Sequence, residues 1–221
     1  LIRTNPPRQV DVPKIKNKNI IRLDPNEIAQ LLDEAESGEK LSGRQLASHE
    51  KTKVRDVAIL TLLLGTGIRV SECVGLNLED VDFNNGAIRI IRKGGNEALI
   101  YFGDEVSQAL EAYMNGPRKK DEPAAGHEEA LFISLNKTRI TARSVERLVK
   151  KYSRLVTTVK KITPHKLRST FGTALYQETG DIYLVADTLG HKDVNTTKKH
   201  YAAIDEHRRR MAANVVKLRE S

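Results

Sequence analysis

The feature that most constrains the fold is the strongly apolar stretch from Val54 to Leu64, which reads VRDVAILTLLL. A helix that is apolar on nearly every side is buried inside a protein rather than laid on its surface. The stretch stops at Gly65-Thr66-Gly67, and glycine is the residue that most readily ends a helix. The sequence therefore predicts a buried helix that ends in a glycine-bounded turn.

Shorter elements are predicted on both sides of this helix. The sequence at 24–27 (DPNE) has the cap, proline and acid of a helix start, and a buried stripe follows at Ile28, Leu31 and Leu32. Residues 37–51 are polar, and we expect a loop or a frayed helix without chemistry. Residues 70–76 predict a short helix, 83–102 a β-hairpin, and 104–115 an amphipathic helix.

In the second half, 116–129 is predicted as a loop and 131–133 as a short apolar strand. Thr141 is predicted to cap a long helix, whose apolar stripe comprises Val145, Leu148, Val149, Tyr152, Leu155 and Val159. A basic stripe on another face comprises Arg143, Arg147, Lys150 and Arg154. Such a helix can pack inward while its basic side lines DNA phosphates, with Thr141 and Arg143 nearest to base edges.

Composition excludes several classes of protein. The chain has 221 residues, enough for one large domain or two small ones, and its 39% hydrophobic and 30% charged residues are typical of a soluble globular protein. It shows no apolar run long enough to span a bilayer and no signal-peptide pattern. The single cysteine, Cys73, excludes an intramolecular disulfide and fits a cytoplasmic location. The histidines show no metal-site spacing, so we expect no metal.

The positive charge is concentrated in two blocks. The net charge is +8, but residues 1–22 carry six Lys/Arg against one acid, and 137–168 carry eleven against one. The rest of the chain is therefore acidic. Two solvated surface faces would also produce this pattern, but two basic blocks on an acidic body favour a surface that binds nucleic acid. Residues 1–22 also contain three prolines and little periodicity, and we interpret them as a basic linker that follows a missing N-terminal domain.

The stretch from Thr163 to Tyr201 carries the chemical signals. Thr163 is predicted to cap a helix that starts at Pro164, and a helix N-terminus attracts phosphate. His165 and Arg168 are three residues apart, so both point to one side of the first turn, and the helix dipole favours a neutral His165. A second face, predicted to anchor the helix in the core, comprises Leu167, Phe171, Ala174 and Leu175.

Further along, Gly190 is predicted to end a helix and to leave His191 exposed, with Tyr201 ten residues later. Taken singly, an H-x-x-R pair, an L-G-H triplet or a tyrosine is more often structural than catalytic. The same holds for two earlier features. Arg69 follows the glycine-bounded turn with Glu72 close enough to pair with it, which alone suggests a surface salt bridge. Lys93 lies beside Gly94-Gly95 at the hairpin tip, where a solubilising charge is common.

Together these residues resemble the catalytic domain of the tyrosine recombinases, the family of phage and conjugative-transposon integrases. The resemblance covers nearly the whole chain from about residue 19 and is carried by the order of five contexts: LLLGTGIRVSECVGL, IIRKGGNEALIYF, TPHKLRSTFGTAL, LGHKDVNTT and KKHYAAI. The interval from His191 to Tyr201 is one residue longer than the spacing most familiar in that family. The linker and the segment 37–51 suggest the integrase of a conjugative transposon or similar integrative element.

The resemblance implies a mainly α fold with a small antiparallel β-sheet (α+β), and strand exchange without metal or cofactor. Tyr201 would attack the scissile phosphate and form a 3′-phosphotyrosyl bond. A phenol with a pKa of about 10 needs help at neutral pH, and His165 would be the base or would hydrogen-bond the phosphate. The remaining implied roles are phosphate binding by Arg69, Arg168 and His191, protonation of the leaving 5′-oxygen by Lys93, and orientation of Arg69 by Glu72.

The resemblance also implies partners and domain limits. We expect residues 1–22 to be the linker, 23–204 the catalytic domain, and 205–221 a tail helix that docks on its own body or on a neighbouring protomer. The expected partners are double-stranded recombination sites, three further copies of the chain in a DNA-bound homotetramer, and an accessory DNA-bending or excision factor. Lys14, Lys16, Lys18 and Lys166 join the basic stripe as candidate DNA contacts.

Two other functions use similar residues. A type IB topoisomerase or telomere resolvase would act on one duplex, and the topoisomerase would relax supercoils without site preference. A non-catalytic relative would bind DNA and give no covalent product.

Overall fold

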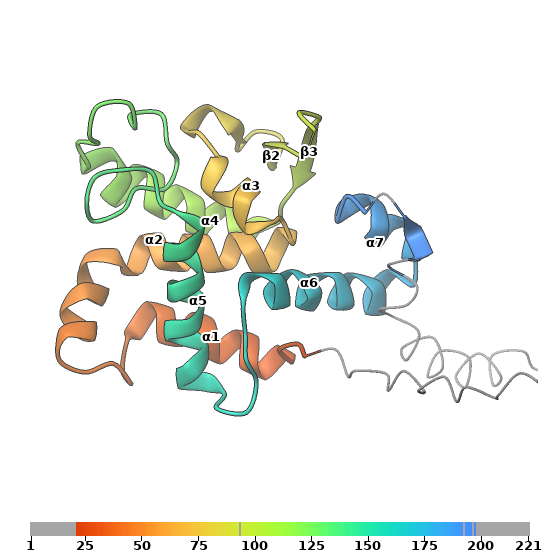
Figure 1. The fold of residues 1–221 in the computed structure, drawn as a ribbon, viewed down its shortest axis with the longest axis horizontal. Coiled ribbons are helices and arrows are strands. Elements are labelled where there is room, and N and C mark those ends of the chain that lie inside the picture. The colour runs from red at the N-terminus through yellow and green to blue at the C-terminus, as the bar shows by residue number, and fades with distance from the viewer. Residues whose placement is uncertain (1–20, 93, 192, 196, 198–221) are drawn as a thin grey trace, which may run out of the picture.

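The structure of the chain, a computed structural model, describes residues 21–92, 94–191, 193–195 and 197. Within these residues helices dominate, and one sheet is present, with three antiparallel strands in the order β1-β2-β3 (Figure 1). The prediction of a mainly α fold with a small antiparallel sheet is therefore confirmed. In this part of the chain no helix is both long enough and apolar enough to cross a membrane.

The first two helices form as the local signals predict, with one exception. Helix α1 (Pro25–Ser37) begins with a capping box, in which Glu27 N–H donates to Asp24 at 2.9 Å and Asp24 N–H to Glu27 at 2.8 Å. Helix α2 (Arg44–Thr66) contains the apolar stretch, and Gly67 ends it in the left-handed conformation. The exception is the segment 37–51, because its residues from Arg44 onward are the regular first turns of α2.

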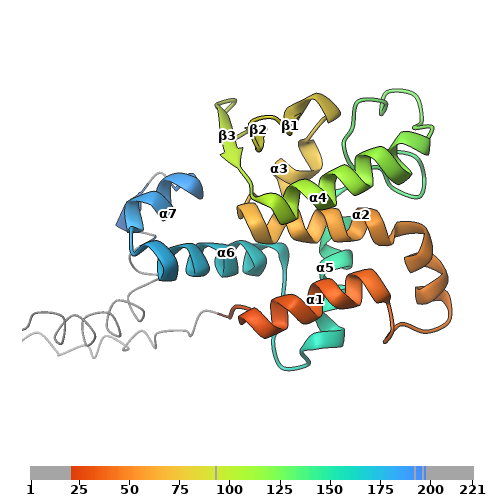
Figure 2. The same cartoon turned by 180° about the vertical axis from the view of Figure 1, so that it is seen from behind.

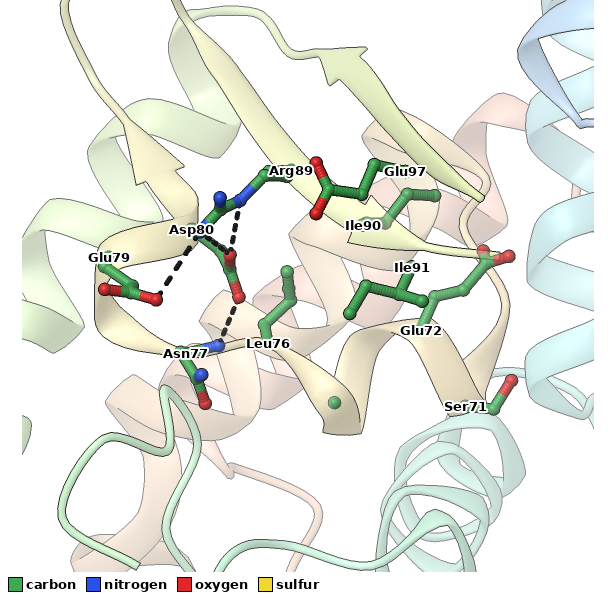
Figure 3. A pocket seen from close by; sticks show the side chains of 11 residues that line it. Ser71, Glu72, Leu76, Asn77, Glu79, Asp80, Arg89, Ile90, Ile91 and Glu97 are labelled. Atoms are coloured by element: carbon green, nitrogen blue, oxygen red, sulfur yellow. Dashed lines mark hydrogen bonds and ion pairs between the residues drawn. The ribbon is translucent and has the colours of Figure 1, made fainter. Parts of the chain in front are cut away.

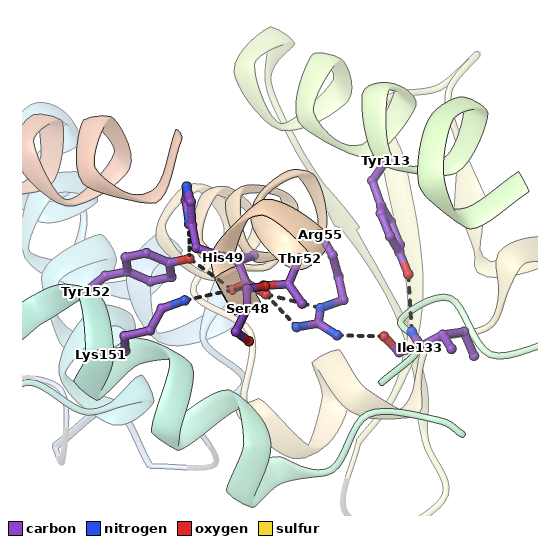
Figure 4. A network of polar contacts seen from close by, with 9 residues as sticks. Ser48, His49, Thr52, Arg55, Tyr113, Ile133, Lys151 and Tyr152 are labelled. Carbon is purple, nitrogen blue, oxygen red and sulfur yellow. Dashed lines mark hydrogen bonds and ion pairs between the residues drawn. The ribbon is translucent and has the colours of Figure 1, made fainter. Parts of the chain in front are cut away.

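A buried polar network explains why α2 starts early (Figure 4). The Asp56 carboxylate accepts from Thr52 and Tyr152, each at 3.0 Å, and pairs with Arg55 at 2.7 Å. The Tyr152 hydroxyl also contacts Nδ1 of His49 at 3.0 Å, and His49 is fully buried. Burial raises the pKa of Tyr152, so its hydroxyl stays protonated and donates to Asp56. The first turns of α2 are thus held by tertiary contacts that sequence periodicity does not register.

The middle of the chain forms the sheet and one long helix. Helix α3 (Val70–Gly75) leads through η1 (Leu78–Asp80) to β1 (Val81–Asp82), and the predicted hairpin is β2 (Ala87–Ile91) with β3 (Glu97–Tyr101). Ala87 pairs with Tyr101 and Ile91 with Glu97. Helix α4 (Asp104–Tyr113) runs into a π-helical turn, η2 (Met114–Arg118), which occupies the start of the predicted loop.

The last three helices are α5 (Ala142–Val156), α6 (Pro164–Thr179) and α7 (Ile182–Thr188). Thr141 caps α5 as predicted, by accepting from Ser144 N–H at 3.2 Å. Two predictions here are wrong. Residues 131–133 form no regular strand, because their contacts to neighbouring backbone stay single: Ile133 makes an isolated bridge to Arg139, Leu131 N–H donates to Leu76 O, and Phe132 O accepts from Ile140 N–H. Val159 is 89% exposed rather than part of the apolar stripe, because α5 ends at Val156.

Helix α2 lies at the centre of the core, where it packs against α1, α4 and α6, while α1 packs against α5. A second, smaller apolar cluster of Tyr176, Val185 and Leu189 holds α7 on α6. Both views show the β-hairpin and α7 on the same side of α6 (Figures 1 and 2). The elements that carry the predicted catalytic residues therefore lie on one side of the molecule.

Candidate active site

The turn after α2 sets the backbone for Arg69. Gly67 has φ +64°, a conformation that favours glycine, and a Cβ there would overlap the ring of Phe171 and crowd Leu189. The chain then extends at Arg69 and turns into α3. Glycine at this position therefore allows α6 and α7 to approach the turn closely.

Arg69 and Glu72 form an ion pair at the start of α3. Arg69 Nη1 donates to Glu72 Oε1 at 2.7 Å, and Arg69 N–H donates to the other carboxylate oxygen at 2.7 Å. The Glu72 side chain is 4% exposed, whereas that of Arg69 is 39% exposed. Glu72 thus holds one edge of the guanidinium and leaves the rest accessible, which is more order than an ordinary surface salt bridge provides.

The far end of α3 is held by Arg139, a residue that the sequence did not single out. Its guanidinium donates to the carbonyls of Val74, Gly75 and Leu76 at 2.7–3.1 Å and to Asn77 Oδ1 at 2.5 Å. A cation on the last carbonyls of a helix is favourable because it meets the negative end of the helix dipole. Helix α3 is therefore fixed at both ends.

The single cysteine provides a direct check that α3 is packed as described. Cys73 is fully buried, and burial raises the pKa of its thiol to about 12. Only the thiolate reacts with iodoacetamide, so we expect the native protein to resist alkylation at about pH 8 and the urea-unfolded protein to label completely. Mass spectrometry measures both states, and rapid labelling of the native protein would contradict the packing of α3.

Helix α6 brings Arg168 into the same region. Arg168 is 7% exposed, and its guanidinium donates to the carbonyls of Gly67, at 2.6 Å, and of Leu189. His165 lies one turn earlier on the same helix and is exposed. Thr163 occupies the cap position as predicted, but its side chain makes no capping hydrogen bond. Of the predicted anchoring residues, Leu167 is fully buried, whereas Ala174 is exposed.

The end of α7 positions His191. Gly190 has φ +60°, its N–H donates to Asp187 O at 2.8 Å, and His191 N–H donates to Ala186 O at 2.8 Å. These two bonds define a Schellman motif, which reverses the chain after a helix. The His191 ring is half-buried rather than exposed as predicted, because its Nδ1 contacts the hydroxyl of the buried Thr197 at 2.8 Å.

Arg92, at the end of the hairpin strand β2, is a second residue that sequence reasoning missed. It donates to the carbonyls of Asp187, at 3.4–3.5 Å, and Thr188, at 3.1 Å. Its Nε is buried and has no hydrogen-bond partner among the described residues. Nothing in the local sequence distinguishes Arg92 from other strand arginines, because its partners lie about a hundred positions away in the chain.

These residues border an open cleft of about 950 Å³ between α3, the β-hairpin and the end of α7. Arg69, Arg92 and His191 contribute polar groups to its wall, and Glu72 lies behind Arg69. Glu97, Asp187 and Asp193 also line the cleft. The cleft can therefore receive an anionic group on the side where the guanidinium groups lie.

A second hollow of about 220 Å³ shares Ser71, Glu72, Ile91 and Glu97 with this cleft, and four of its 11 lining residues are acids (Figure 3). There Arg89 is paired with Asp80 at 3.0 Å and with Glu79 at 3.4 Å. The Glu72 carboxylate is turned away from the Asp80–Arg89 pair, so it is available to Arg69 (Figure 3). Arg89 is the one basic residue in the lining of this hollow, and both of its acidic partners lie beside it, so the hollow suits phosphate less well than the cleft does.

Several predicted residues lie outside the described part of the chain: Lys93, Tyr201, Lys14, Lys16 and Lys18. The predicted DNA-contacting residues of the α5 region, Thr141, Arg143, Arg147, Lys150 and Arg154, are all exposed, and Lys166 on α6 is half-buried. Among the described residues, no group of three or more His, Cys, Asp or Glu is arranged to hold a metal ion.

Comparison with known proteins identifies relatives for most of the chain. Residues 21–208 match the model of the phage integrase family. The tyrosine recombinase XerC of Thermodesulfovibrio yellowstonii is 36% identical over 199 residues, which cover 89% of this chain and 62% of that protein. The chain spans about half the length of the curated relatives it matches.

Solved structures of recombinases are also similar to this chain. The crystal structure of XerA recombinase is similar with a TM-score of 0.70 and 26% identity, covering 86% of this chain and 65% of that one. The Tn1549 transposon integrase in complex with circular intermediate DNA is similar with a TM-score of 0.64 and 26% identity, covering 91% and 67%. These similarities confirm the predicted tyrosine recombinase catalytic-domain fold.

Proposed function

This chain belongs to the phage integrase family, and we propose that it is the catalytic part of a site-specific tyrosine recombinase that cleaves and rejoins double-stranded DNA. One observation carries the proposal: Arg69, Arg168 and the backbone before His191 meet at a single turn beside an open cleft. Planar guanidinium groups fixed in this way suit the non-bridging oxygens of a phosphodiester. The names of the relatives, recombinases and a DNA-bound integrase, support it.

In the proposed reaction the Tyr201 phenol oxygen attacks the scissile phosphorus, and the bond from phosphorus to the 5′-oxygen breaks. The products are a 3′-phosphotyrosyl bond and a free 5′-hydroxyl, which receives its proton from Lys93. One phosphate ester replaces another, so the bond energy is kept. A 5′-hydroxyl from a second strand can then reverse the step, which exchanges strands instead of hydrolysing them.

The proposed roles follow from what each described side chain can donate. Arg69 is accessible while Glu72 fixes its orientation, so it can bind a phosphate oxygen with little reorganisation. Arg168 donates to the carbonyls of Gly67 and Leu189, which fix its guanidinium beside the turn, and it is the proposed ligand of a second phosphate oxygen. His165, exposed at the first turn of α6, is the proposed base, and His191 the proposed ligand of a further oxygen.

The domain limits and partners belong to the same proposal. We assign 1–22 to a basic linker, 23–204 to the catalytic domain and 205–221 to a tail that docks on a neighbouring protomer of a DNA-bound tetramer. The exposed basic side of α5 supports DNA contact along this helix. The proposed setting is the bacterial cytoplasm, in the integration or excision of a mobile element, with an accessory DNA-bending or excision factor.

Covalent trapping tests the reaction. The full-length natural protein and its Tyr201→Phe variant are incubated with an end-labelled duplex that carries the host element's site and a nick just beyond the cleavage point. We expect a protease-sensitive band on a denaturing gel from the natural protein and none from the variant, because phenylalanine has no oxygen to attack phosphorus.

The other outcomes separate the alternatives. A band that persists in Tyr201→Phe would show that another residue is the nucleophile. Relaxation of supercoils on any sequence would indicate topoisomerase activity. Tight binding without a band would indicate a non-catalytic module.

A further inference from the structure

Three arginines from three different elements converge on the carboxyl end of α7. Arg92 just after β2, Arg168 of α6 and Arg69 at the start of α3 donate hydrogen bonds to the successive carbonyls at 187–190. Each of these four carbonyls therefore has a guanidinium donor. Carbonyls at the end of a helix lack partners within the helix and carry partial negative charge, so they attract cations.

Arg92 is the member of this group whose role the proposed reaction leaves open. Arg69 and Arg168 are assigned to the phosphate, whereas the guanidinium of Arg92 is occupied by the carbonyls of Asp187 and Thr188. Its Nε is a buried donor without an acceptor among the described residues, which is costly for stability. A buried donor of this kind calls for an explanation, and the contacts of Arg92 with the turn at 187–190 offer one.

Gly190 has a backbone shape that accommodates Arg92. A Cβ at Gly190 would overlap the Nη1 atom of Arg92 and lie 2.5 Å from its Cζ. The guanidinium therefore occupies the space that a side chain at position 190 would fill. The β-hairpin and the turn before His191 are joined by this contact, which links segments that are far apart in sequence.

We propose that Arg92 is a positioning residue that holds the turn at 187–191 in its place relative to Arg69 and Arg168. Helix α7 has seven residues and is held by a small apolar cluster, so the hydrogen bonds to its carboxyl end largely determine its orientation. Without Arg92 the turn loses its link to the hairpin, and His191 and the acceptor of Arg69 at Gly190 shift together. A misplacement of about 1 Å is enough to cost on the order of 100-fold in rate.

The inference rests on the proposed function, and its test compares five forms of the full-length protein with the wild type. These are Arg92→Ala, Arg92→Lys, Gly190→Ala, the double variant Arg92→Ala/Gly190→Ala, and Arg89→Ala. Arg89 is the matched control because it is an arginine of β2, the strand that ends just before Arg92, and it pairs with Glu79 and Asp80 instead of the turn at 187–190. Single-turnover covalent-complex formation, DNA affinity and amide hydrogen exchange at 186–191 are measured.

We expect Arg92→Ala and Gly190→Ala each to slow covalent-complex formation about 10- to 100-fold at saturating DNA, with DNA affinity changed less than about threefold. Arg92→Lys keeps the charge without the planar fork and should recover part of the rate. The double variant should be no slower than the worse single variant, since both changes remove the same contact. Exchange at 186–191 should rise in Arg92→Ala and stay unchanged in Arg89→Ala.

Two outcomes overturn the inference. The first is a weaker DNA affinity in Arg92→Ala with an unchanged saturated rate, which would make Arg92 a DNA-phosphate contact. The second is unchanged exchange at 186–191 in Arg92→Ala, whether or not the wild type cleaves DNA. Faster exchange in that variant, combined with a wild type that forms no covalent complex, would support the positioning contact and refute the proposed function alone.

Discussion

Substitution of Arg168 by alanine is expected to slow covalent protein–DNA complex formation on the order of 10²- to 10³-fold at saturating DNA. In the proposed reaction the variant loses a fixed donor where charge develops on the phosphate. It also leaves the carbonyls of Gly67 and Leu189 without their donor, so the turn after α2 and the end of α7 separate. Arg168→Lys should recover only part of the rate, because an ammonium lacks the planar fork that reaches both carbonyls. Single-turnover gel assays on a nicked substrate measure the rates.

The chain offers a matched control for this substitution. Arg118 is also a buried arginine that donates to two backbone carbonyls, those of Ala130 and Glu128, at 3.0 and 2.5 Å, but these acceptors are not the turns at Gly67 and Leu189 that Arg168 holds. Either alanine variant should lose about 2–4 kcal/mol of unfolding free energy, because two carbonyls lose their donor. Only Arg168→Ala should lose the cleavage rate when both variants are assayed folded. An equal loss of rate in Arg118→Ala would mean that the Arg168 effect is structural.

The largest effect on stability is expected from Asp56→Ala, at about 3–5 kcal/mol of unfolding free energy. Asp56 is 2% exposed and is the shared acceptor of the network between α2 and α5. Its removal takes the ion-pair partner from Arg55, whose guanidinium keeps its hydrogen bond to Ile133 O, and it takes the carboxylate acceptor from the Tyr152 hydroxyl. Urea denaturation measures the loss, which is a large fraction of the total for a domain of ordinary stability.

Two further variants test whether the loss of stability comes from the network. Asp33→Ala removes the same side chain from an exposed position on α1 and should change the free energy of unfolding by less than about 0.5 kcal/mol. Tyr152→Phe combined with Asp56→Ala should cost less than the two single losses added, because each removes the other's partner. A cost below about 1 kcal/mol for Asp56→Ala would mean that the network does not hold the first turns of α2.

The network also explains where sequence interpretation failed in the fold. The segment 37–51 is polar and contains two glycines, so periodicity alone indicated a loop or frayed helix. His49 lies inside it and is fully buried against Tyr152, which is about a hundred positions away. Likewise Val159 fits the apolar spacing of α5, but the helix ends three residues earlier, at Val156. In both cases tertiary contacts decided what local propensity left open.

The sequence by itself determined the features that depend on short-range chemistry. The capping box at Asp24, the cap at Thr141, the turn at Gly67 and the helix end at Gly190 follow from residues only a few positions apart, and each forms as predicted. The order of the motifs was also enough to indicate the family.

Only the tertiary structure decided which side chains meet. Arg168 is buried between two turns, His191 is half-buried, and Arg92, which the motifs did not include, contacts the same turn. These contacts join β2, α3 and α6 to the end of α7, and their geometry depends on how α2 and α6 pack in the core. A local pattern carries no information about such distances, because a guanidinium takes whatever carbonyls the packing brings within reach of its donors.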